Sequence, residues 1–352
     1  MTALTLPARP EHDASLRPVP WRRMAWVTWR QHRFALAGVA ALLGALAVWL
    51  WIAGLQLHHA YAAATTCHPA SSPACADLVT SFNGMGGILA NGFILQAVPA
   101  LIGAFAGAPV LAREMEAGTF RYAWTQGFGR WRWTLAKLVP LAVTVAAAAG
   151  AVSVLVSWYY QPYLAPGNQA LSLTEWSPLA AGLFTLRGIA FAAWTLAAFA
   201  IGALAGMLIR RVVPAMAATL AAYTGLAFAA GLYLRQHYLI PLVARNLFNP
   251  PGNAFIASQW WTKGGNFAFA GRPPINLMMQ FCPPSAVGAV GPGKPSPGTL
   301  WRCFAQHGYT QWTSYQPASR FWPFQWIEGG WLLALSVLLI AVTIWLVRRR
   351  AT

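Results

Sequence analysis

Four cysteines are the residues of this sequence that could form covalent cross-links: Cys67, Cys75, Cys282 and Cys303. Four cysteines allow three different pairings. The topology derived below places all four on the outer side of a membrane, where thiols oxidise. The local pairs Cys67–Cys75 and Cys282–Cys303 are therefore the simplest expectation, with free thiols as the alternative.

Histidines and acidic residues form no recognisable catalytic or metal-binding set. His58, His59 and His68 lie near Cys67, but their spacing matches no established zinc pattern. The apolar spans predicted below contain no His, Asp, Glu, Lys or Cys, and the long outer segment shows no nucleophile–base pair. We therefore expect neither an enzyme nor a metal protein.

The nearest match to a phosphate-binding loop is Gly288-x-x-x-x-Gly293-Lys294. Pro295 follows where a Ser or Thr would bind Mg²⁺, and the stretch lies in a Pro-rich segment without a strand–helix context. We interpret the match as chance and expect this chain to bind no ATP.

The pattern most suited to binding another protein lies at residues 113–137. Glu114 and Glu116 come first, and aromatic and basic residues follow. Such a mixture is typical of a docking surface, and residues 113–126 can form a short helix. A solvated loop with ordinary membrane-flanking arginines explains the pattern equally well.

Polar residues in or beside apolar stretches need partners in a membrane. Asn91 and Gln96 therefore predict that their helix faces protein or a cavity. Arg187 and Glu328 each precede a predicted span at the outer side, and one hypothesis is that they pair, or pair with lipid and with Glu175. The alternative is that each reaches the membrane surface independently.

The elements that position these residues are membrane helices. The chain has 352 residues, of which 57% are hydrophobic and only 9% charged, too apolar for a soluble fold of this length. We predict an all-α membrane protein with six transmembrane helices at 34–57, 88–112, 138–159, 188–209, 212–234 and 331–347. Gly103-x-x-x-Gly107 and Gly202-x-x-x-Gly206 would allow close helix contact.

A small-residue motif at Ala60-Tyr61-Ala62 resembles a signal-peptide cleavage site. We prefer a retained first span, because the preceding apolar run is longer than that of a signal peptide.

The basic residues predict the orientation. The segments 1–33, 113–137, 210–211 and 348–352 carry 16 of the 24 Lys and Arg, although the connections on the other side are much longer. Positive residues accumulate on the cytosolic side. Both termini are therefore predicted in the cytosol, with the chain in a bacterial cytoplasmic membrane.

The sequence divides into five segments along the chain. Residues 1–20 form a cytosolic tail, 34–235 hold spans one to five with the loop 113–137, 236–327 form an extracellular cap, and 328–352 hold span six and a basic end. Residues 21–33 predict an amphipathic helix at the membrane interface, with its aromatic and basic side chains at Trp21, Arg22, Arg23, Trp29, Arg30 and Arg33. In the cap, 12 of the 25 Pro and six Trp favour an ordered segment of short helices and turns.

The loop 113–137 resembles the first intracellular loop of permease subunits of type-2 ABC exporters. The shared elements are the acidic pair, Gly118-Thr119, Thr125-Gln126, Arg130 and Lys137. The six spans, the interfacial helix and an extended segment between the last two spans also agree with that family. The outer segment is longer than is typical there, and the two candidate disulfides are a further departure.

The resemblance implies a permease driven by a separate ATP-binding subunit. The loop would be a coupling helix seated in that subunit, with contacts at Glu114, Glu116, Gly118, Thr119, Phe120, Arg121 and Gln126. Two such subunits, with ATP and Mg, and a second permease chain, identical or related, would complete the exporter. Its cargo would be hydrophobic or amphipathic, and the pathway candidates are Asn91, Gln96 and Phe93.

Two alternatives to export stay open. A membrane sensor or scaffold would bind a ligand at the cap and signal to an ATPase without moving cargo. The second alternative is a membrane-embedded enzyme, and the lack of catalytic groups in the predicted spans argues against it. Nucleic acid is not an expected partner, because the basic residues lie at the ends of apolar runs.

Overall fold

A computed structural model gives the fold of most of the chain. It describes residues 21–69, 72–85, 93–119, 130–165, 176–246, 253–283 and 297–350. In chain order the helices are α1 (Trp21–Thr66), α2 (Pro73–Gly84), α3 (Phe93–Ile102), the π-helix η1 (Gly103–Gly107), α4 (Ala108–Ala117), α6 (Arg130–Tyr159), α7 (Gln161–Leu164), α8 (Ala181–Phe184), α9 (Ala190–Ile209), α10 (Val212–Ala229), the π-helix η3 (Ala230–Leu234), η4 (Arg235–His237), α11 (Ile275–Phe281), α13 (Pro297–Gln306), η5 (Ala318–Arg320) and α14 (Phe321–Arg350). The strands are β1 (Leu242–Arg245), β2 (Phe255–Lys263), β3 (Asn266–Ala270) and β4 (Tyr309–Gln316).

Among the residues that the structure describes, six helical stretches are long and apolar enough to cross a membrane, which agrees with the predicted number of spans. They are Leu36–Thr66, Leu95–Ala117, Arg130–Tyr159, Ala190–Ile209, Val212–His237 and Ala318–Arg349. Several run further than predicted, because charged and aromatic residues continue the helices beyond the apolar runs. Lys137, Arg235 and Glu328 therefore lie within these stretches, and the predicted absence of acidic residues and lysine from the spans is wrong.

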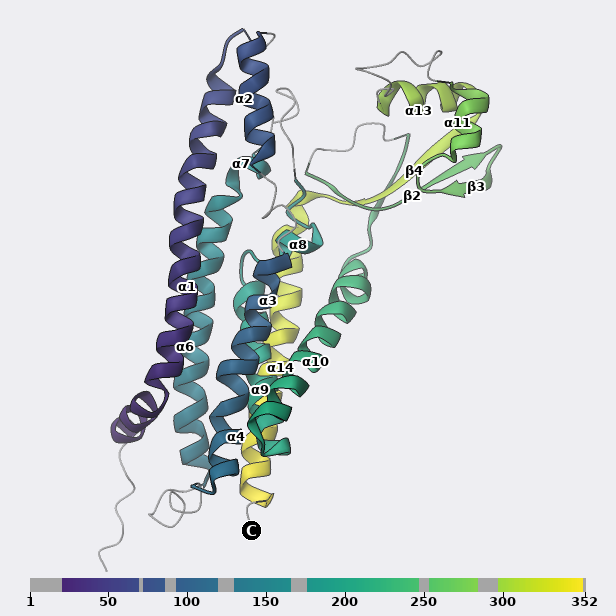
Figure 1. Cartoon of the computed structure of the whole chain (residues 1–352). Helices are drawn as coiled ribbons and strands as arrows, with labels where there is room; N and C mark the ends of the chain where they lie inside the picture. The colour runs from purple at the N-terminus through teal and green to yellow at the C-terminus, as the bar shows by residue number, and fades with distance from the viewer. Residues whose placement is uncertain are drawn as a thin grey trace, which may run out of the picture.

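Helix α9 lies at the centre of the bundle and contacts α3, α4, α6, α10 and α14 (Figure 1). The predicted glycine motifs are what allow its close approach to the second span. A Cβ added to Gly202 would lie 2.3 Å from the carbonyl oxygen of Gly103, and one added to Gly107 would lie 2.6 Å from that of Phe199. Only hydrogen fits at such positions, so the two helices pack backbone to backbone.

The second span is one helix with an irregular middle. Pro109 has no N–H to donate to the carbonyl of Phe105, and the helix widens into the π-turn η1 just before this proline. The fourth and fifth spans join in the predicted tight hairpin. Arg210 ends α9 in the left-handed conformation at φ 59°, and Arg211 is extended before α10 begins.

Between the fifth and sixth spans the chain forms a four-stranded antiparallel sheet in the order β1-β4-β2-β3. The expected short helices are present as α11 and α13, but the four strands were not predicted. Tryptophans that were expected to anchor a cap instead pair across strands, with Trp260 opposite Trp312 and their rings 6.4 Å apart. Figure 1 shows the sheet projecting from one end of the bundle, away from the end that holds Arg350. We call these the sheet end and the basic end.

The outer part of the sheet has its own small core. Trp261, Phe304 and Tyr309 are buried together with Cys282, under α11 and α13. Both predicted disulfides are present: Cys282 is bonded to Cys303, and Cys67 to Cys75. The first fastens α11 to α13, and the second fastens the end of α1 to the start of α2.

Candidate functional site

The candidate coupling surface lies at the basic end, where α4 stops. Helix α4 continues the second span to Ala117, and Gly118 ends it in the left-handed conformation at φ 68°. Helix α6 already begins at Arg130. The expected separate helix over 113–126 is therefore wrong for residues 113–117, which belong to the span itself.

Glu114 connects the second span to the third. Its carboxylate forms an ion pair with the Lys137 ammonium on α6. Lys137 is only 3% exposed, and its Nζ lies 4.3 Å from the centre of the Trp133 ring. A buried ammonium is stable only when it is paired, so this carboxylate is needed for packing.

Glu116 connects the second span to the fifth. Its Oε2 accepts a hydrogen bond of 3.0 Å from the backbone N–H of Val212, the first residue of α10. A carboxylate at this position satisfies a free amide and complements the positive end of the helix dipole. The two acidic residues thus hold three spans together at one corner of the basic end.

Around this corner several side chains are exposed to solvent and able to meet a partner. Arg113, Glu116 and Thr119 are exposed, and Glu114 is half-buried. The other residues predicted to contact an ATPase, Phe120, Arg121 and Gln126, lie outside the described residues. Contact of this surface with an ATP-binding subunit stays a prediction.

The predicted interfacial helix is the first part of α1 and is continuous with the first span. Figure 1 shows α1 bending near this end. Trp29, Arg30 and Arg33 are exposed, whereas the side chains of Trp21, Arg22 and Arg23 are outside the described part of the structure. A position in the membrane interface stays a prediction.

The pathway candidates lie at the start of the second span. Gln96 is half-buried on α3, Phe93 is the first residue of α3 without a described side chain, and Asn91 falls outside the described residues. The side chains of Asn91 and Phe93 are outside the described part of the structure, so a pathway formed by these three residues stays a prediction.

At the sheet end a buried ion pair joins the fifth and sixth spans. Glu328 on α14 is fully buried, and both of its oxygens accept bonds from Arg235, from Nη2 at 2.8 Å and from Nε at 3.0 Å. The Trp194 Nε1 donates to the same carboxylate at 2.7 Å, and the Tyr238 hydroxyl donates at 3.2 Å. Two-point pairing with added donors is what a carboxylate buried this deeply requires.

The predicted pair of Arg187 with Glu328 is wrong, because Arg235 already occupies the carboxylate. Arg187 instead lies with its guanidinium carbon 5.1 Å from the centre of the Phe321 ring, and its buried Nε has no hydrogen-bond partner among the described residues. Burial lowers the pKa of Arg187 to about 10. The sequence analysis ended the fifth span at residue 234, directly before Arg235, and gave Arg235 no role. The available signal was its position at the same membrane edge as Glu328.

Gln325, one turn before Glu328, extends this network to the fourth span. Its Oε1 accepts a hydrogen bond of 2.8 Å from the N–H of Ala190, the first residue of α9, and its Nε2 donates to the carbonyl of Phe184 at 2.9 Å. Together Gln325 and Glu328 fasten α14 to the fourth and fifth spans beneath the sheet. The arrangement provides mechanical linkage and offers no group with the geometry of a nucleophile and its base.

Comparison with known proteins identifies the family. Residues 40–235 match the family described as ABC-2 membrane transporter related. The match covers more than half of the chain, so the protein belongs to this family. No curated protein and no solved structure shows significant similarity to it.

Proposed function

From this membership we propose that the chain is the membrane-spanning subunit of an ATP-driven exporter. It would work with a separate subunit that binds ATP and Mg and hydrolyses the ATP. The basic end would face the cytosol of a bacterium, with both termini there, because Lys and Arg concentrate at this end. A second permease chain and two ATP-binding subunits would complete the assembly. The cargo would be hydrophobic or amphipathic, since the described spans present mainly apolar side chains.

The observation that carries the proposal is the corner formed by Glu114 and Glu116. A partner that pushes on residues 113–119 would move the second span together with the third and the fifth, because ionic and hydrogen bonds connect all three there. Such a connection converts a small movement of a docked subunit into a concerted tilt of several helices. This is the mechanical requirement of alternating access.

The experiment is co-purification of the tagged chain with its ATP-binding subunit from the native membrane. Arg113→Glu changes an exposed charge at the corner, and Arg348→Glu changes an exposed charge at the same end on α14 and serves as the matched control. We expect Arg113→Glu to weaken recovery of the ATPase several-fold at unchanged yield of the chain, and the control to retain it. Equal recovery with both variants, or no ATPase with the unmodified chain, would contradict the proposal.

Reversal of Glu114 is unsuitable for this test, because it would leave the Lys137 ammonium buried without a counter-ion. Removing one member of a buried pair costs about 3–5 kcal/mol. A Glu114 variant would therefore lose the ATPase through damage to the fold as readily as through damage to the docking surface.

A second candidate function is a membrane sensor that signals to an ATPase without transport. The sheet and the helices beside it favour this function, since they have their own core and strongly exposed apolar side chains, such as Phe267 on β3 and Ile275 on α11. Reconstitution of the chain with its ATPase in vesicles separates the two functions. Export predicts ATP-dependent movement of a hydrophobic cargo, whereas sensing predicts ATPase activity that a ligand modulates without any flux.

A further inference from the structure

A groove of about 930 Å³ lies between α1 and α6. It exists because small side chains face each other there and leave space that neither helix fills. On α1 these are Ala37, Ala40, Gly44 and Ala47, and on α6 they are Ala148 and Ala151. A volume of this size is within the range of ligand pockets, and the walls are almost entirely apolar.

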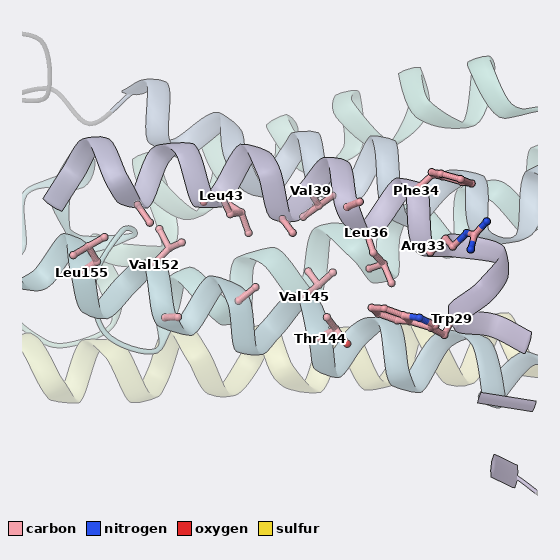
Figure 2. A pocket seen from close by; sticks show the side chains of 16 residues that line it. Trp29, Arg33, Phe34, Leu36, Val39, Leu43, Thr144, Val145, Val152 and Leu155 are labelled. Carbon is pink, nitrogen blue, oxygen red and sulfur yellow. The ribbon is translucent and has the colours of Figure 1, made fainter. Parts of the chain in front are cut away.

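One end of the groove is cationic and aromatic. Figure 2 shows Trp29, Arg33 and Phe34 at the end nearest the start of α1, and Val152 and Leu155 at the other end. Arg33 is exposed, with its guanidinium carbon 4.8 Å from the centre of the Phe34 ring. Among the described residues that line the groove none is acidic.

We propose that this groove binds an anionic phospholipid of the surrounding membrane, with an acyl chain between α1 and α6 and the phosphate at Arg33. Both walls belong to predicted spans, so the occupant comes from the bilayer. An apolar slot continuous with an exposed arginine matches a molecule with an apolar body and an anionic head.

The exposed aromatic residues at the mouth support this occupant. The side chains of Trp29 and Phe34 are 59% and 76% exposed, which is typical of rings that lie at the headgroup level. Arg30, also exposed, lies with its guanidinium carbon 5.3 Å from the centre of the Trp26 ring, and adds a second cation to the same end of α1. The proposal does not depend on export, because lipid binding is a property of this chain alone.

The test measures binding of acyl-labelled phosphatidylglycerol and phosphatidylcholine with identical chains to the purified full-length chain in a neutral detergent. Arg33→Gln removes the cation at the mouth. Arg349→Gln is its control, since Arg349 is also exposed and its guanidinium carbon lies 4.7 Å from the centre of the Trp345 ring on another helix. We expect Arg33→Gln to weaken phosphatidylglycerol binding about fivefold, the effect of ~1 kcal/mol per arginine near an anionic headgroup, and to leave phosphatidylcholine unchanged.

A second pair of variants tests the groove itself. The double substitution Ala40→Leu with Ala151→Leu fills it from both walls. The control is Ala41→Leu with Ala147→Leu, at exposed positions of the same helices that do not line it. We expect the filled groove to lose binding of both lipids and the control to keep it. Equal binding of the two lipids by the unmodified chain, equal loss in Arg33→Gln and Arg349→Gln, or unchanged binding after filling would overturn the proposal.

Discussion

The buried pair of Arg235 and Glu328 gives the sharpest prediction about what holds the sheet end of the bundle together. Arg235→Met retains the shape of the aliphatic stem and removes the cation. The carboxylate of Glu328, fully buried, keeps only the neutral donors Trp194 and Tyr238. An unpaired buried charge costs about 3–5 kcal/mol.

The same reasoning predicts a compensating second change. In Arg235→Met with Glu328→Gln no charge remains, and the Gln oxygen can still accept from Trp194. We expect the double variant to lose only about 1–2 kcal/mol, less than either single variant. The coupling, which is the sum of the two single losses minus the loss of the double variant, would then be at least ~4 kcal/mol, whereas distant independent positions add to within about 0.5 kcal/mol.

The assay is thermal unfolding of the purified chain in detergent. Size-exclusion chromatography measures the folded fraction that remains after heating to each temperature. At about 2.1 cal/mol/K per residue, the unfolding entropy of 352 residues is ~0.7 kcal/mol/K, so each single variant should lower Tm by roughly 4–7 °C and the double variant by about 1–3 °C. Arg349→Met, at an exposed position, should leave Tm unchanged. A double variant as unstable as the sum of the two single variants would refute the pairing.

Two further predictions concern packing and covalent linkage. Gly202→Ala places a Cβ 2.3 Å from the Gly103 carbonyl oxygen and should lower stability by about 1–3 kcal/mol. Gly150→Ala, where a Cβ meets nothing within 4 Å, should be neutral or stabilising. The Tm values of the two variants test this, and equal values would contradict the close packing of the second and fourth spans. Replacing Cys282 and Cys303 by Ala should destabilise the sheet region by about 3 kcal/mol, since the bond closes a loop of 21 residues. Faster proteolysis between β2 and β4, with the spans still protected, is the expected readout, and unchanged cleavage rates would show that the sheet does not need this bond.

Part of the fold follows from the sequence alone, and the reason is local chemistry. Apolar runs long enough to cross a bilayer must become helices there, because a membrane offers their backbone no other hydrogen-bond partners. The six spans and the hairpin at Arg210–Arg211 were predicted on that basis and are present among the described residues. The glycine contacts were predicted from the spacing of small residues and are also present. The local disulfide pairs followed from short separations along the chain in the same way.

The tertiary structure decided the features that depend on which distant residues meet. Arg187 and Arg235 are equally plausible partners for Glu328 in the sequence, and only the packing of α14 against η4 selects Arg235. Glu114 was predicted as a contact for another protein, yet its position beside Lys137 makes it a structural counter-ion. The sheet depends on the pairing of β2 with β4, which are about 50 residues apart in the chain. No local sequence pattern predicts which residues of two such distant strands lie opposite each other. A sequence fixes which residues must leave water, but the partners of the buried charges and the pairing of strands are fixed only when the whole chain has packed.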